Sequence, residues 1–277
     1  MKEHLARFLG VGIFVITLSC FPARSAPGVV HLAKFSDSSI DESSGLAASK
    51  RFPGIFWTHN DQGHAPVLFA VNRSGKTLAR YKITGATITD WEDVAVDSSG
   101  QVYIADTGNN DGSRDKVQVY SLPEPNPGKS GSAMVQRTWK LKYPSSGAFN
   151  GEAFFVNNGF GYLVGKDLVN NGAPVYRFPI TSPGSFTLQR IGTLKVNSRV
   201  TGASVSADNS SLGIISEGGA YVFQINGSAL RAFSIRPFFT PLNETSMEGG
   251  TFAGDGFLVS SENGDLFLFN QAPFRKK

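Results

Sequence analysis

Residues 92–106 read EDVAVDSSGQVYIAD: a short apolar segment, a Ser-Ser-Gly turn and a second apolar run. The same order recurs along the chain, and this recurrence decides the fold. The repeated segments are GLAAS (45–49), DVAVD (93–97), AFFVN (153–157), SVSAD (204–208) and GGTFA (249–253), spaced 48, 60, 51 and 45 residues apart. A repeat of this length built from strands is typical of a β-propeller blade.

Each repeat continues with a polar loop and an alternating apolar strand. These strands are expected at 66–72, 116–122, 173–180, 220–225 and 265–270, and fourth strands at 77–83, 135–143, 186–196 and 229–235. The last repeat lacks a fourth strand, which the run VVHLAKFS (29–36) can supply. The sequence therefore predicts an all-β fold: a five-bladed β-propeller of four-stranded blades, with the ring closed by the N-terminal strand.

The chain ends that flank this repeat give the expected domain organisation. Residues 1–25 combine a charged start, an apolar core at 8–21 and small residues before residue 26, which is typical of a secretory signal peptide. The apolar core is too short for a membrane span, and lipid attachment at Cys20 is the alternative. We expect a single propeller domain over 26–277, a secreted or periplasmic location, and a monomer with no membrane span.

The distribution of charge along the chain argues against nucleic acid as a partner. The formal net charge is +4 and the isoelectric point about 9.1, but basic residues gather in the N-terminal segment and the last three positions. No basic stripe remains in the repeats, so we expect no nucleic acid and instead a small-molecule or glycan ligand.

Propeller topology predicts which polar residues meet. The start of each innermost strand and the loop between the second and third strands open on one face. The loops on this face carry acidic, basic, amide and histidine side chains, whereas the loops on the opposite face are shorter and plain in composition. Expected catalytic residues are Asp61, Asp106, Arg114 and Glu262, and expected substrate-binding residues are His59, Asn60, Asn109, Lys166 and Asp167.

A second set stands directly before the aligned segments. These residues are Ser44, Glu92, Glu152, Ala203 and Glu248. Carboxylates that face one another across a narrow channel repel unless a cation lies between them. Hard oxygen ligands favour calcium, and the set has neither His nor Cys for zinc. We therefore predict Ca²⁺ held by Ser44, Glu92, Glu152 and Glu248. The alternative is that these side chains bind backbone amides and water.

The same set carries a resemblance. The sequence resembles the calcium-dependent nucleotidases (apyrases), which implies a five-bladed propeller whose axial calcium is held by a Ser, Glu, Glu, Ser, Glu series. Ser44 in ESSGL, Glu92 in DWEDVAV, Glu152 in NGEAFF and Glu248 in MEGG match the series, and Ala203 departs from it, with Thr201 and Ser204 nearby. The family's Asp-Asp-Arg-Thr-Gly loop corresponds to residues 60–63, which lack the arginine. The stretch from DWEDVAV to YIADTGNN is also similar to the SdiA-regulated and phytase-esterase-like bacterial propellers.

Three functions remain open on the sequence. The first is a calcium-dependent hydrolase of phosphorylated or otherwise anionic small molecules. The second is a non-catalytic propeller that binds a ligand or protein and keeps the calcium for structure. The third is a glycosidase with paired carboxylates. Convergence of the loop residues beside the ion favours an enzyme.

Overall fold

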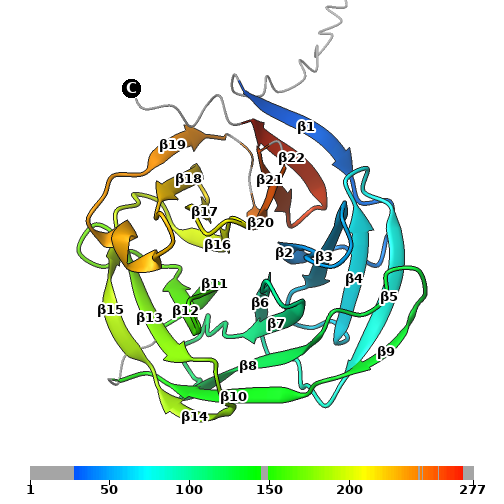
Figure 1. The fold of residues 1–277 in the computed structure, drawn as a ribbon, viewed down its shortest axis with the longest axis horizontal. Helices are drawn as coiled ribbons and strands as arrows, with labels where there is room; N and C mark the ends of the chain where they lie inside the picture. The colour runs from blue at the N-terminus through cyan, green and yellow to red at the C-terminus, as the bar shows by residue number, and fades with distance from the viewer. Residues whose placement is uncertain (1–27, 145–148, 243, 245, 255, 271–277) are drawn as a thin grey trace, which may run out of the picture.

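Five β-sheets surround a central channel in the computed structural model of the chain (Figure 1). The structure describes residues 28–144, 149–242, 244, 246–254 and 256–270, so the predicted signal peptide lies outside the described residues. We number the sheets as blades I to V in chain order. Their innermost strands are β2 (Ser43–Ala48), β6 (Trp91–Val96), β11 (Gly151–Asn157), β16 (Val200–Val205) and β20 (Met247–Ala253).

Each blade continues outward by antiparallel pairing, as the repeat predicts. The second strands are β3 (Ile55–Asn60), β7 (Gln101–Asp106), β12 (Phe160–Gly165), β17 (Ser211–Ser216) and β21 (Gly256–Ser261). The third strands are β4 (Val67–Asn72), β8 (Lys116–Pro123), β13 (Ala173–Pro179), β18 (Gly219–Gln224) and β22 (Asp265–Asn270). The alternation of direction brings the start of each innermost strand and the loop after each second strand to one end of the channel.

The N-terminal strand closes the ring. The outermost strands of blades I to IV are β5 (Thr77–Thr84), β10 (Arg137–Lys142), β15 (Gln189–Leu194) and β19 (Phe238–Pro241). In blade V that place belongs to β1 (Val29–Lys34), which pairs antiparallel with β22. The two ends of the described chain thus share one sheet, and β22 has no open edge on that side.

The outer edges of blades I, II and IV differ from the sequence prediction. Residues 229–235 were expected to form the outer strand of blade IV, but they contain the 3₁₀ helix η1 (Ala229–Phe233), and β19 is the outer strand. Two short strands extend other blades: β9 (Gly131–Met134) pairs parallel with β5, and β14 (Gly184–Thr187) pairs parallel with β10. Blades I and II therefore have five strands.

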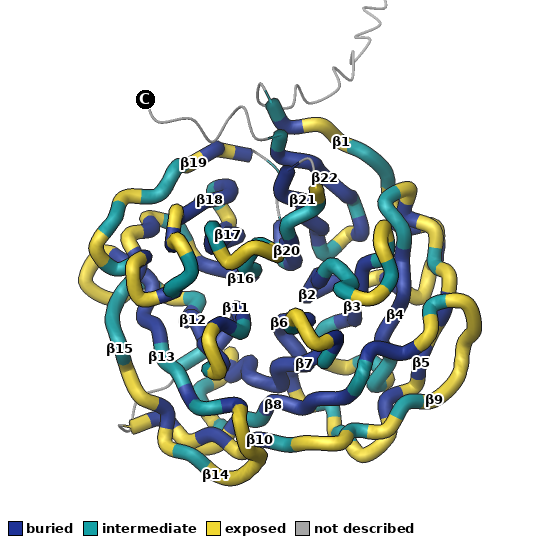
Figure 2. The backbone as a smooth tube through the Cα atoms, in the orientation of Figure 1, coloured by how far each residue is buried: buried dark blue, intermediate teal, exposed yellow. Residues whose placement is uncertain are grey.

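Apolar side chains fill the wedges between neighbouring blades. The backbone of the innermost strands is coloured mostly as buried in Figure 2. Trp57 and Trp91 are fully buried in the cluster between blades I and II, and Trp139 is fully buried between blades II and III. Replacing a ring of this kind with alanine costs about 3–5 kcal/mol. Helices contribute little, and none in the described part of the chain has the length and apolarity of a membrane span.

Candidate functional site

An irregular register at the start of each innermost strand sets up the channel mouth. In all five blades the pairing with the second strand shifts within the first residues of the strand. Such β-bulges insert an unpaired residue and re-aim its side chain. We call one residue of each irregular stretch a ring position: Ser44, Glu92, Glu152, Thr201 and Glu248. In β2 the irregular stretch also includes Gly45.

The fourth ring position corrects the sequence alignment. In blade IV, Val200 pairs with Ser216 and Gly202 with Ile215, so the residue skipped by the ladder is Thr201. Ala203, which the sequence alignment placed in the ring, is a regularly paired residue of β16. Thr201 is buried, and its Oγ1 has no hydrogen-bond partner among the residues that the structure describes. All five ring positions thus carry an oxygen on the side chain.

Three ring carboxylates share one ammonium group. Lys166, directly after β12, places its Nζ 2.9 Å from Glu152 Oε1. Burial lowers the pKa of Lys166, but the carboxylates of Glu152, Glu92 and Glu248 outweigh it and raise that pKa above its ordinary value. Lys166 is therefore charged at neutral pH, and its ammonium group is a positive charge that the chain itself supplies next to the ring positions.

A tighter acidic group lies beside the ring. Asp61 from the β3–β4 loop, Asp90 just before β6 and Glu92 offer carboxylate oxygens that all lie within 4.8 Å of one another. We call these residues the acidic triad. Asp90 and Glu92 are buried, and Asp90 Oδ1 and Glu92 Oε1 have no hydrogen-bond partner within the described residues. Two unpaired buried carboxylate oxygens at one place leave positions that a cation could occupy.

A glycine forms one wall of the triad. Gly108 follows β7, and its amide donates to Asp90 O at 3.2 Å. A Cβ at this residue would collide with Glu92 Oε1 and with the Asp90 carboxyl group. The backbone therefore lies against the carboxylates at a distance that only glycine permits.

The carboxylates of the mouth resist ionisation. Burial, followed by the charges of Asp61 and Glu152, raises the pKa of Asp90 to about 7. Burial and the charge of Glu152 raise the pKa of Glu248 to about 8. Burial, then Glu152 and the other two triad members, raises the pKa of Glu92 well above its usual range. A bound cation would reverse this tendency, because it favours the ionised forms.

The donor set suits a hard divalent cation. The triad supplies only carboxylate oxygens, which are ligands that calcium, magnesium and manganese accept. The ligands predicted from sequence overlap with it at Glu92. Ser44 Oγ donates to Glu92 O at 2.7 Å, and Glu152 is engaged by Lys166 and by Asn150 Nδ2 at 2.5 Å. Asp90 was missed, although it belongs to the quoted stretch DWED, because it stands two positions before the ring residue.

Asp106 and Arg114 lie behind the triad and hold its walls. Asp106 is fully buried, and its Oδ1 accepts from the Asp90 amide at 2.9 Å and from Arg114 Nη2 at 3.0 Å. Arg114 also donates to Gly108 O at 2.6 Å. The catalytic roles predicted for Asp106 and Arg114 remain predictions, and their contacts are those of residues that position Asp90 and Gly108.

Three predicted substrate-binding residues are tied into the loops. Asn60 Nδ2 donates to Ser39 O at 2.7 Å, and Asn109 accepts from the Arg114 amide at 2.8 Å. His59 is fully buried, with its ring 5.6 Å from that of Trp91 in an edge-to-face arrangement. Burial lowers the pKa of His59, so its imidazole is neutral at neutral pH. These three side chains therefore make contacts within the protein that fix the loops around the channel mouth.

The two remaining predicted residues lie in different places, one near the ring positions and one on the surface. Glu262 follows β21 and lies near enough to Glu248 for its charge to raise the pKa of that residue. Asp167 is exposed and pairs with Arg199 at 3.1 Å on the surface. The structure thus brings Asp61, Lys166 and Glu262 to the ring of carboxylates, and it leaves Asp167 outside.

Comparison with known proteins gives a fold and no family. No family model and no curated protein matches the sequence. A gluconolactonase from Xanthomonas campestris superposes with a TM-score of 0.52 at 12% identity, over 87% of this chain and 89% of that one. The Dos1 propeller has a TM-score of 0.43 at 12% identity, over 79% of this chain and 52% of that one. A chain of the mitotic checkpoint complex also reaches 0.43, at 13% identity, over 98% and 73%. At these identities the similarity concerns the propeller fold alone.

Proposed function

We propose that the protein is a divalent-cation-dependent hydrolase of small anionic or phosphorylated molecules, with the acidic triad as its cation site. The observation that carries the proposal is the pair of buried, unpaired oxygens, Asp90 Oδ1 and Glu92 Oε1, beside Asp61. Calcium is the cation we expect, because it accepts several oxygen ligands in a flexible geometry.

The chain's own groups support hydrolysis next to this site. A divalent cation, when bound, polarises a substrate oxygen and promotes ionisation of water. Asp61 is only partly buried, so the triad is open to a ligand on that side. Lys166 offers a fixed positive charge that attracts and orients an anionic substrate. Glu248, a ring carboxylate whose charge acts on Lys166, is the group that we expect to accept and return a proton beside the cation.

One observation favours the alternative of a binding propeller with a structural cation. The Asp106, Arg114 and Asn109 side chains are engaged by their own loop, so they are not free to contact a substrate. In that case the cation would fix the loops for recognition of a ligand. Turnover separates the two functions.

The test begins with calorimetric titration of calcium into the metal-stripped protein and into Glu92→Gln. We expect one site in the native protein and its loss in the variant, while Asp167→Asn, a surface acid outside the triad, binds as the native protein does. Turnover of nucleotides, sugar phosphates and p-nitrophenyl phosphate is then measured with and without calcium. A sugar lactone joins the panel because a gluconolactonase shares the fold. Calcium binding without turnover would favour the binding propeller, and no binding would remove the cation from the function.

A further inference from the structure

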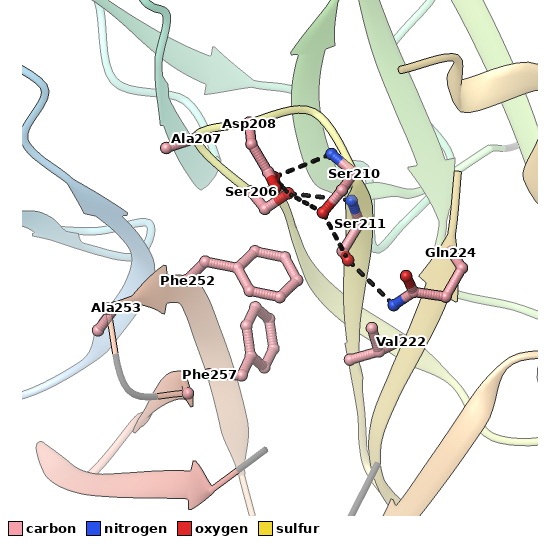
Figure 3. A pocket seen from close by; sticks show the side chains of 12 residues that line it. Ser206, Ala207, Asp208, Ser210, Ser211, Val222, Gln224, Phe252, Ala253 and Phe257 are labelled. Atoms are coloured by element: carbon pink, nitrogen blue, oxygen red, sulfur yellow. Dashed lines mark hydrogen bonds between the residues drawn. The ribbon is translucent and has the colours of Figure 1, made fainter. Parts of the chain in front are cut away.

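A cavity lies between blades IV and V, on the face of the ring opposite the acidic triad. It measures about 490 Å³ and is lined by both polar and apolar side chains (Figure 3). Glu248 is the second residue of β20 and a ring position, and Phe252 stands four residues further along the same strand. At the rise of an extended chain, these residues lie about 13 Å apart. The cavity is therefore separate from the acidic triad.

An aromatic pair forms the apolar wall. Phe252 on β20 and Phe257 on β21 have ring centroids 4.8 Å apart and planes inclined at 55°. Phe257 is fully buried, and a Cβ on Gly213 of the neighbouring blade would collide with its ring. The close fit fixes Phe257, and the half-buried ring of Phe252 lies over it at the cavity. Phe252 thus rests on a buried ring that its neighbours hold in place.

Hydroxyl and carboxylate groups form the facing wall. Ser206 Oγ donates to Asp208 Oδ1 at 2.6 Å and accepts from the Ser211 amide at 2.9 Å. The Ser210 amide donates to the same Asp208 oxygen at 3.0 Å. Gln224 Nε2 donates to Ser211 Oγ at 3.1 Å. The polar wall is therefore ordered by its own hydrogen bonds.

This wall keeps acceptors for a ligand. No hydrogen bond among the described residues uses Asp208 Oδ2 or Gln224 Oε1, and both side chains are exposed. The residues that line the cavity include one carboxylate and no lysine, arginine or histidine within the described chain. An anionic ligand would meet the Asp208 charge without compensation. A ligand with several hydroxyl donors would find partners.

We propose that this cavity binds a neutral sugar ring. The apolar C–H face of the sugar lies against Phe252, and its hydroxyl groups donate to Asp208 and Gln224. The volume is within the range of small-molecule sites, about 300–1,000 Å³. An aromatic face opposite a hydroxyl-rich wall matches the two sides of a saccharide. The site is independent of the cation and of the function proposed for the acidic mouth.

The test uses the full chain in excess chelator, so that the acidic triad plays no part. Glucose, galactose, mannose, N-acetylglucosamine, maltose and cellobiose are tested by saturation-transfer NMR and calorimetry, with gluconate and glucose 6-phosphate as anionic counterparts. We expect at least one neutral sugar to bind and the anions to bind more weakly. Phe252→Ala should raise the dissociation constant roughly tenfold or more.

Two further variants keep the result decisive. Gln224→Ala changes an exposed side chain and should weaken binding even if Phe252→Ala does not fold. Phe239→Ala removes a 41% exposed ring of β19 outside the cavity and should leave binding unchanged. The proposal is overturned if no neutral sugar binds, if the anions bind more tightly, or if binding is indifferent to both cavity variants.

Discussion

Glu92 belongs to two charge groups at once. As a ring position it shares the positive charge of Lys166 with Glu152 and Glu248, and as a triad member it faces Asp61 and Asp90. Lys166 compensates only part of this negative charge. The buried carboxylate oxygens left without a hydrogen-bond partner in the described chain belong to Asp90 and Glu92, on the triad side. The charge balance at single residues therefore makes the triad the group of described residues that could hold a cation.

Replacing Asp90 with asparagine tests this balance. Asp90→Asn keeps the shape of the side chain and removes a charge from a buried acidic group, so the metal-free protein should fold as well as the native protein or better. Calcium affinity should fall roughly tenfold or more, because one ligand charge is lost. Thermal melting of the metal-free protein and calorimetric titration measure the two effects. Unchanged calcium affinity would place the cation elsewhere.

At the scale of the strand, the bulge explains what the sequence could and could not predict. The period of the repeat, the alternation of apolar residues and the missing last strand were sufficient for five blades and their closure by β1. They could not reveal which residue a bulge skips, because a bulge depends on pairing between strands. The alignment therefore chose Ala203 over Thr201. It also left out Asp90, because only the folded structure shows that the β3–β4 loop brings Asp61 close to Asp90. Outer strands were predicted less well, since short polar edge segments carry little periodicity.

The unpaired hydroxyl of Thr201 gives a prediction for the bulge of β16. Thr201→Val should be neutral or should stabilise the metal-free protein by roughly 1 kcal/mol, because it removes a buried hydroxyl that lacks a partner. Thr58→Val is the matched control: Thr58 is also buried, but its Oγ1 lies 3.0 Å from Ser43 Oγ. The control should destabilise by about 1–2 kcal/mol. Chemical denaturation of both variants compares them, and a loss of stability in Thr201→Val equal to that in Thr58→Val would show that Thr201 has a partner.

At the scale of the whole molecule, the ring concentrates acidic groups at one end of the channel and has a mixed polar and aromatic cavity between blades IV and V on the opposite face. The sequence pointed only to the first, because short loops with serine and glycine look plain until a neighbouring blade supplies Phe252 and Phe257. The acidic groups at this end also affect the stability of the entire fold. Each carboxyl group whose pKa is higher in the folded state than in the unfolded state makes the free energy of unfolding depend on pH.

The metal-free protein should therefore lose stability as pH rises through neutrality. Asp90, with a pKa raised to about 7, and Glu248, with a pKa raised to about 8, keep protons in the folded state that the unfolded chain has already released. Because the folded state binds more protons, the free energy of unfolding falls from about pH 5 to about pH 8.5. The measurement is the melting temperature across this range, in chelator and in calcium. Calcium should remove the fall, since a cation stabilises the ionised carboxylates and binds the folded state more tightly as pH rises. Glu248→Gln should flatten part of the metal-free profile. A melting temperature that rises or stays level with pH in chelator would show that these carboxyl groups are compensated without a cation.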